Sequence, residues 1–259
     1  MNLTSDTYFS PEAQAAYMGA SQFKAFRACE ESVLARLRGE WEEPRSTSLL
    51  VGSYVDAYFE GKLDRFKEQN PEIFTKQGSL KAEYRRADLV IARIERDPML
   101  MRYLSGEKQV IKTGEIAGVP FKIKMDSYHP GKAIVDLKVM KDFRNIWEPD
   151  ERRYVPFAEY WGYDFQGAIY QEIVRQETGH RLLFFIAAAT KEESPDIALL
   201  HIPQERLDAC LAVVREMAPA YQAIKEGREE PTRCNRCDYC KASKVITQIV
   251  DYTLAGYAG

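Results

Sequence analysis

Two carboxylates and a lysine lie close together in the middle of the sequence, in a pattern that can bind a metal ion. Asp136 and Lys138 are two residues apart in the apolar stretch AIVDLKV, and Asp126 ends the preceding stretch VPFKIKMD. Charges persist in such stretches when they are paired or coordinate a metal. Two carboxylates form a hard oxygen site suited to Mg²⁺ or Mn²⁺. A neighbouring ammonium can orient an attacking water or stabilise a pentacovalent phosphate.

These residues must be carried by β-strands. The segment 107–139 contains β-branched and aromatic residues in short runs, with turns at Ala117-Gly118 and Pro130-Gly131, which predicts a three-stranded meander. Side chains alternate along a strand, so Asp136 and Lys138 would project together and Leu137 into the core. The alternative is that these are ordinary outward-facing charges on a solvated strand, because Asp-x-Lys is a common tripeptide.

The remaining patterns predict helices around a mixed sheet. Apolar spacing and capping residues predict helices at about 21–38, 48–61, 79–96, 156–178 and 203–226. Two further strands are expected at 181–190 and 196–203. This order predicts an α/β or α+β fold with helices on the faces of a mixed sheet.

We expect one domain from the 259 residues. Its parts would be a helical N-terminal part (1–105), a catalytic α/β core (106–226), and a cysteine loop with a tail (227–259).

The composition is that of a soluble globular protein, with 45% hydrophobic and 29% charged residues. No apolar run approaches the roughly 20 residues that span a bilayer, and the first residues lack a signal peptide's basic start and apolar stretch. A cytoplasmic location without a membrane partner is therefore expected. The net charge of −3 gives no basic footprint for nucleic acid, although local basic clusters occur around Lys122, Lys138 and Arg152.

The cysteines suggest a second metal centre. Three of the five, Cys234, Cys237 and Cys240, fall within seven residues, which indicates ligation of a metal or a cluster. A fourth ligand must come from elsewhere, and Cys29 is the candidate. Cys210 lies in the apolar helical stretch LDACLAVV, which favours a buried thiol.

The order Asp126, Asp136-x-Lys138, Gln166-x-x-x-Tyr170 resembles that of the PD-(D/E)xK nuclease superfamily. The similarity is greatest to RecB-like exonucleases and phage RecE-like (exodeoxyribonuclease VIII-type) proteins. It implies a restriction-endonuclease-like fold and a metal-dependent DNA exonuclease that hydrolyses phosphodiester bonds. Gln166 and Tyr170 are four residues apart and would share a helix face, from which they would contact the DNA strand or Lys138.

The resemblance also implies roles for the central residues. Asp126, Asp136 and the backbone carbonyl of Leu137 would hold Mg²⁺ or Mn²⁺, and Lys138 would position or activate a water. The proline that gives the superfamily motif its name is absent, and Met125 stands in its place.

A further ligand in that branch comes from a helical Gly-x-x-x-His motif. This chain has Gly52-x-x-x-Asp56, so an aspartate replaces the histidine. An aspartate can still bind magnesium, and Glu60, one helical turn later, could assist. The replacement leaves an alternative open, a catalytically weakened DNA-binding or assembly module stapled by an iron–sulfur or zinc site.

A subset of RecB-like nucleases carries a [4Fe–4S] cluster, with one cysteine before the nuclease motifs and three after them. Cys29, Cys234, Cys237 and Cys240 reproduce that arrangement. The last spacing is shorter than usual in the family, so zinc and an empty site remain alternatives. The centre would act as a staple between the first helix and the tail.

DNA is the implied partner, with its single- or double-stranded form left open. Phage RecE-like proteins act beside annealing proteins, so the resemblance implies phage-type recombination or DNA end processing with a single-strand annealing recombinase. A homo-oligomer is also open. Four aromatic residues could stack on bases, but a place in the core is the more common use of such a cluster and is expected here. They are Trp147, Tyr160, Trp161 and Tyr163.

Overall fold

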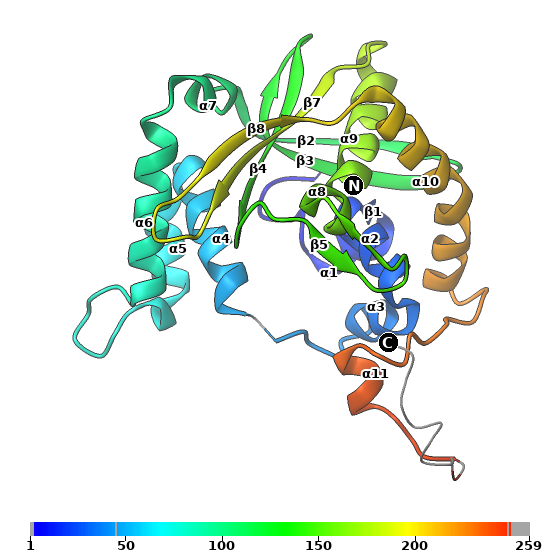
Figure 1. The fold of residues 1–259 in the computed structure, drawn as a ribbon. Coiled ribbons are helices and arrows are strands. Elements are labelled where there is room, and N and C mark those ends of the chain that lie inside the picture. Colours follow the sequence, from blue (N-terminus) through cyan, green and yellow to red (C-terminus); the bar gives the residue numbers. More distant parts are fainter. Residues whose placement is uncertain (1–2, 45, 248, 250–259) are drawn as a thin grey trace.

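A six-stranded mixed sheet forms the centre of the computed structural model, which describes residues 3–44, 46–247 and 249 (Figure 1). Five of its strands follow one another in the order β1-β3-β4-β7-β8. The sixth strand, β2, pairs with β3 outside this order. They are β1 (Met18–Gly19), β2 (Glu107–Ile116), β3 (Val119–His129), β4 (Ala133–Met140), β7 (Leu183–Thr190) and β8 (Ile197–His201). A separate hairpin consists of β5 (Ile146–Glu148) and β6 (Arg153–Val155).

The strand directions make this sheet mixed. β2, β3 and β4 form the predicted antiparallel meander, β4 pairs with β7 in parallel, and β7 pairs with β8 antiparallel. The two-residue strand β1 pairs in parallel with β3 and is too short to leave a sequence pattern. The predicted α/β (α+β) class with a mixed central sheet is thus confirmed.

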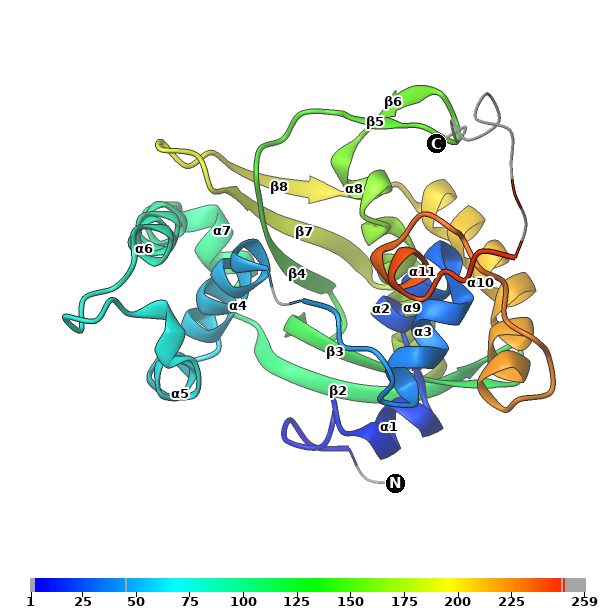
Figure 2. The ribbon, with the colours of Figure 1, turned by 90° about the horizontal axis from the view of Figure 1, so that it is seen from below.

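Helices cover both faces of the sheet (Figures 1 and 2). One side carries α4 (Thr47–Phe59), α5 (Leu63–Gln69), the 3₁₀ helix η1 (Pro71–Ile73), α6 (Ala82–Glu95) and α7 (Pro98–Tyr103). The other side carries α1 (Pro11–Ala16), α2 (Ala20–Ala28), α3 (Glu30–Leu37), α8 (Phe157–Tyr160), α9 (Tyr163–Thr178), α10 (Gln204–Lys225) and α11 (Asp238–Ala242). The division into one domain with three parts stays a prediction, and the end of its tail, 250–259, lies outside the described residues.

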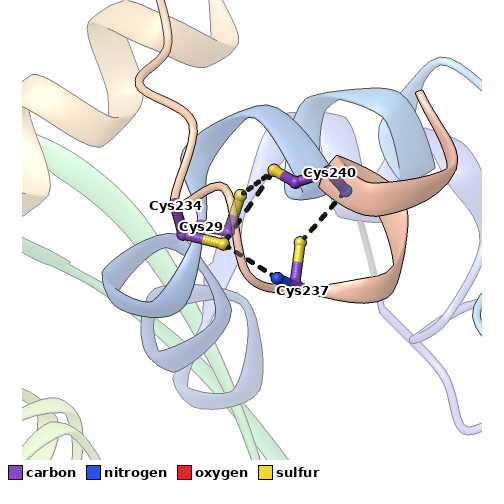
Figure 3. A group of neighbouring side chains, drawn as sticks. All are labelled: Cys29, Cys234, Cys237 and Cys240. Carbon is purple, nitrogen blue, oxygen red and sulfur yellow. Dashed lines mark hydrogen bonds between the residues drawn. The ribbon is translucent and has the colours of Figure 1, made fainter. Parts of the chain in front are cut away.

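The first predicted helix, 21–38, is interrupted, and this part of the prediction was wrong. Cys29 has an extended backbone (φ −167°, ψ 108°) and separates α2 from α3. The break lets the cysteine loop dock, because Glu31 N–H donates to the Thr232 carbonyl at 3.1 Å and Thr232 N–H donates to the Glu30 carboxylate at 2.7 Å. The thiol of Cys29 thereby faces the loop (Figure 3).

The helix predicted at 156–178 is also interrupted, between α8 and α9. Gly162 lies in the left-handed region (φ 62°) that favours glycine. A side chain there would collide with Lys24, whose Cδ would lie 2.7 Å from an added Cβ. Gly162 therefore provides both the turn and the space for Lys24.

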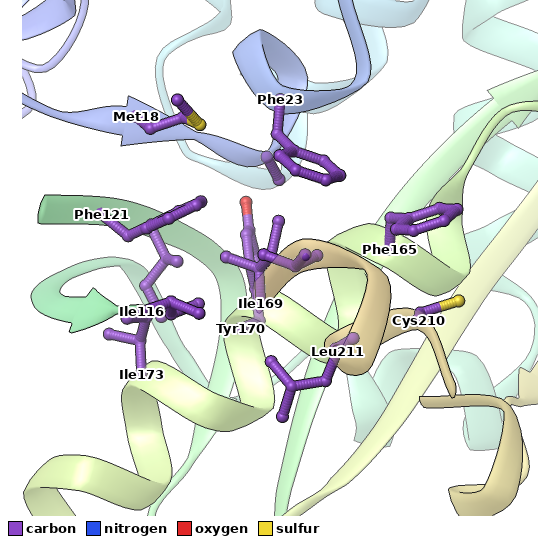
Figure 4. Close-up of a cluster of buried hydrophobic side chains, with 14 of the residues drawn as sticks. Met18, Phe23, Ile116, Phe121, Phe165, Ile169, Tyr170, Ile173, Cys210 and Leu211 are labelled. Atoms are coloured by element: carbon purple, nitrogen blue, oxygen red, sulfur yellow. The ribbon is translucent and has the colours of Figure 1, made fainter. Parts of the chain in front are cut away.

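A hydrophobic cluster lies between the sheet and α2, α9 and α10 (Figure 4). Phe23, Phe121 and Ile169 are fully buried in it. A second cluster, between α4, α6 and the opposite face of the sheet, contains Val135 and Leu137 of β4. Leu137 thus points into the core, as the alternation along the strand predicted.

Three of the four aromatic residues expected in the core lie at the surface instead. The exposed fractions are 49% for Trp147, 37% for Tyr160 and 52% for Trp161. They belong to the short β5–β6 hairpin and to the end of α8, which lie outside the central sheet. Within the part of the chain that the structure describes, no helix has the length and apolar character needed to cross a membrane.

Two helical glycines should respond in opposite ways to an added side chain. A Cβ at Gly167 on α9 would lie 2.6 Å from Cδ1 of Phe184 and 3.0 Å from Cδ2 of Leu207. Gly167→Val should lower the free energy of unfolding by about 1–3 kcal/mol, because it overpacks the core. Gly52→Ala on α4 meets no atom within 4 Å and should raise it by about 0.5–1 kcal/mol. Urea unfolding measures both, and equal responses would contradict the close packing at Gly167.

Candidate functional site

The candidate site lies where β3 and β4 separate. Their ladder includes the pair Ser127–Val135, and the next facing pair in this register would be Asp126 and Asp136, where the ladder has ended. Two carboxylates directly opposite each other in a sheet repel. The N–H of Leu137 donates to Asp126 Oδ2 at 2.9 Å, so a side chain of β3 takes the place of a backbone acceptor.

Asp136 is held on two sides. Its side chain is 3% exposed and forms an ion pair with the ammonium of Lys138. Gln166 Nε2 on α9 donates to Asp136 Oδ1 at 2.7 Å. The predicted pair on β4 and the predicted glutamine on the following helix are therefore brought together.

The charges of the site perturb one another. Burial raises the pKa of Asp126 to about 7, and the negative charge of Asp136 adds to the shift. Burial also raises the pKa of Asp56 well above its ordinary value, with repulsion from Asp126. For Lys138 burial alone would lower the pKa, but Asp136 and Asp126 outweigh it and raise it. Lys138 is therefore a cation at neutral pH, whereas Asp56 and Asp126 take up protons more readily than free carboxylates do.

A small cavity beside these groups has a volume of about 10 Å³. That is roughly the space of one water-sized sphere. It is lined by Asp56, Asp126 and Leu137, three of the four predicted metal ligands, and also by Phe59, Glu60, Leu104, Lys108 and Gln109. Asp56, Glu60 and Asp126 bring three carboxyl groups to the lining of a space of this size, a donor set that suits one divalent cation.

Lys24 and Tyr163 belong to the site, although the sequence predicted no role for Lys24. The ammonium groups of Lys24 and Lys138 each lie 5.2 Å from the ring centroid of Tyr163. Lys24 Nζ also donates to the carbonyl of Trp161 at 3.0 Å. Burial lowers the pKa of Lys24 to about 8, and repulsion from Lys138 adds to this. No motif marks Lys24, because it lies on α2, far from Asp136 in the chain.

Gln166 and Tyr170 share a face of α9, as predicted, but both are buried, with exposed fractions of 8% and 7%. The Tyr170 hydroxyl donates to the carbonyl of Lys124 on β3 at 2.9 Å. Burial raises the pKa of Tyr170 well above its ordinary value. The contacts of both residues are with the strands of the site, and their contact with DNA stays a prediction.

Cys29, Cys234, Cys237 and Cys240 form the second candidate centre (Figure 3). Their sulfur atoms all lie within 4.8 Å of one another, although Cys29 comes from the break between α2 and α3. Cys210 lies apart in α10, where burial raises its pKa to about 12, in keeping with the predicted buried thiol.

Backbone groups favour a thiolate at Cys234, whereas burial raises the pKa of Cys237 and raises that of Cys29 to about 12. Cys237 N–H donates to Cys234 Sγ at 3.3 Å, and Cys240 N–H donates to Cys237 Sγ at 3.4 Å. Burial would raise the pKa of Cys234, but hydrogen bonds from the backbone of Arg236 and Cys237 outweigh it and lower the pKa to about 6. A thiolate is the form that ligates metals.

Comparisons with known proteins agree with this geometry. The profile of a family described as "PDDEXK-like domain of unknown function (DUF3799)" matches residues 19–243, which contain the acidic centre and all four cysteines. The chain is also similar to the crystal structure of a "Putative exonuclease" from Eubacterium rectale. The two are 50% identical over 99% of this chain and 100% of that chain, with a TM-score of 0.94. A search of curated proteins finds no match.

Asp126→Asn should stabilise the metal-free protein at pH 8. The pKa of Asp126 rises from 3.8 to about 7 on folding, so the folded protein binds more protons than the unfolded chain between these values. Stability is therefore lost as the pH rises through this window. Removing the charge should raise the free energy of unfolding by about 1–3 kcal/mol at pH 8, and by less at pH 5.

Chemical unfolding in the presence of EDTA measures this effect. Asp64→Asn, at an exposed position on α5, is the comparison and should change stability by less than about 0.5 kcal/mol at either pH. A stability loss in Asp126→Asn at pH 8 would contradict the charge burial assigned to Asp126.

Proposed function

Since the chain belongs to the PDDEXK-like family of the PD-(D/E)xK nuclease superfamily, we propose that it is a Mg²⁺- or Mn²⁺-dependent deoxyribonuclease. The observation that carries this proposal is the separation of β3 and β4 at Asp126 and Asp136. It leaves Asp126 at a cavity of about 10 Å³ that Asp56 also lines, while Asp136 is paired with Lys138.

The ligands proposed for the ion are Asp56, Asp126, Asp136 and the carbonyl of Leu137. When bound, the ion would supply Lewis-acid chemistry, which polarises a phosphate and lowers the pKa of water. The lining of the cavity by Asp56 supports the idea that an aspartate can serve where the family has histidine. Burial and the charge of Asp126 disfavour the charged form of Asp56 in the metal-free protein, and a bound cation would favour that form.

Lys138 would act as a cation. Its raised pKa keeps it protonated in the metal-free protein, so it can orient a water and stabilise negative charge on phosphate.

Gln166 would hold Asp136, and Tyr170 would fix β3 through Lys124, so both act as positioning residues. Lys24 presents a second ammonium beside Tyr163, suited to a phosphate of the same DNA strand.

We further propose that the reaction is exonucleolytic and serves phage-type recombination or DNA end processing. The description of the similar Eubacterium rectale protein as an exonuclease supports the first part. The second part rests on the resemblance to RecB-like and RecE-like proteins. A single-strand annealing recombinase as partner and a homo-oligomer stay predictions.

A nuclease assay on linear duplex DNA with Mg²⁺ or Mn²⁺ tests the proposal. Lys138→Ala should lower kcat by about 100-fold or more, because it removes the cation that faces the reacting phosphate. Lys132→Ala, an exposed lysine in the turn before β4, is the matched control and should keep the activity of the unmodified chain. EDTA should abolish cleavage by the unmodified chain and by Lys132→Ala.

Two outcomes would count against the nuclease. The unmodified chain could cleave no DNA with either metal, or Lys138→Ala could cleave as fast as Lys132→Ala. Tight DNA binding without cleavage would instead support the catalytically weakened DNA-binding or assembly module.

For the cysteine centre we propose a bound metal that joins α2 and α3 to the C-terminal loop. The sulfur of Cys240 lies 3.5 Å from that of Cys29 and 3.9 Å from that of Cys234. Zn–S bonds of about 2.3 Å in a tetrahedron put sulfurs about 3.8 Å apart, which supports a single zinc ion. A [4Fe–4S] core would hold the four sulfurs farther apart, and it remains the competing prediction.

Metal analysis of anaerobically purified protein should find one metal centre per chain. Zinc without visible colour would support the single ion, whereas iron, sulfide and absorption near 400 nm would support the cluster. Cys29→Ser should lose the metal and lower Tm by about 10 °C, because a link between distant segments is lost. Cys210→Ala should keep the metal content unchanged. Metal-free protein from anaerobic purification would contradict both forms of the centre.

A further inference from the structure

Gln109 has an unusual backbone conformation inside a regular strand. It lies in β2 with φ 53°, the left-handed region that non-glycine residues rarely adopt. The other non-glycine residues with positive φ in the described chain, Ala117, Arg152 and Asn235, lie in turns and loops. Strain of this kind persists where surrounding structure imposes it, and it clusters at functional sites.

The strained residue lies opposite Asp126. The β2–β3 ladder pairs Lys108 with Ser127 and Val110 with Met125, and leaves out the pair between them, Gln109 and Asp126. The ladder between β3 and β4 also ends next to Asp126. Asp126 is thus released from regular pairing on both sides.

The side chain of Gln109 enters the acidic site. Its Nε2 donates to Asp126 Oδ1 at 3.3 Å, while Leu137 N–H donates to Oδ2, so both carboxylate oxygens are oriented. Its Oε1 is buried and accepts no hydrogen bond from any described residue. Gln109 lines the same cavity as Asp56 and Glu60. A buried carbonyl oxygen without a donor lowers stability unless something else occupies that position.

We propose that Gln109 is a positioning residue and a further oxygen ligand of the divalent ion, a role that rests on the proposed function. Its amide N–H orients Asp126, and Oε1 donates a neutral oxygen to the ion in the cavity. Glutamine carbonyls are suitable ligands for hard cations, and they add a ligand without adding negative charge.

Mn²⁺ titration by calorimetry, without DNA, tests this role in the full chain. Gln109→Gly should weaken Mn²⁺ binding by about 10- to 100-fold. Its Tm without metal should not fall, because glycine adopts φ 53° without strain. Gln109→Glu keeps an oxygen at this position and should bind Mn²⁺ at least as tightly as the unmodified chain.

Thr113→Gly, at an exposed position on the same strand, is the matched control and should bind Mn²⁺ normally. Unchanged Mn²⁺ affinity in Gln109→Gly would overturn the role of Gln109 and leave the proposed nuclease intact. Weaker binding by Gln109→Glu than by Gln109→Gly would also overturn it. If the unmodified chain bound no Mn²⁺, both the proposed function and this inference would fail.

Discussion

The repulsion between Asp126 and Asp136 is the constraint on which the site depends. The two residues would face each other if the β3–β4 ladder continued, and the ladder ends one pair earlier. Four contacts hold the carboxylates in place: the Lys138 ammonium and the Gln166 amide on Asp136, and the Leu137 N–H and the Gln109 amide on Asp126. Burial, and after it the charge of Asp136, nevertheless raises the pKa of Asp126 to about 7. The fold therefore buries carboxyl groups that take up protons in the metal-free protein, and a divalent cation can replace those protons.

The two hydrophobic clusters give this charged site its rigidity. Val135 and Leu137 anchor β4 in the cluster with α4, which brings Asp56 to the cavity. Ile134 and Met140 anchor the same strand in the cluster with α2 and α9, and Gln166 of α9 reaches Asp136 from that side. A strand buried on both faces cannot shift its register without moving apolar side chains to the wrong positions. The site is thus assembled from elements on both faces of the sheet, at the point where the sheet itself separates.

The sequence predicted those parts of the fold that depend on periodic patterns. The bounds of β2 (Glu107–Ile116) agree with the predicted start of the meander at 107 and with its predicted turn at Ala117-Gly118. The pairing of Asp136 with Lys138 followed from the same alternation. Local conformations beside distant contacts could not be predicted. The extended Cys29 precedes Glu30 and Glu31, which hydrogen-bond to Thr232, and the left-handed Gln109 hydrogen-bonds through its side chain to Asp126. The place of Lys24 was missed for a related reason, since the turn at Gly162 creates it from the other side of the site.

Helix α2 connects the two centres. It carries Lys24 to the ring of Tyr163 and ends at Cys29, which contributes its sulfur to the cysteine group. A metal held by Cys29 and the three cysteines of the loop would fix the C-terminal end of α2, and with it the position of Lys24. No described side chain of the acidic site belongs to the cysteine group, and the cysteine sulfurs contact one another rather than the acidic residues. This arrangement favours a structural role, in which the cysteine centre positions an element of the acidic site without taking part in its chemistry.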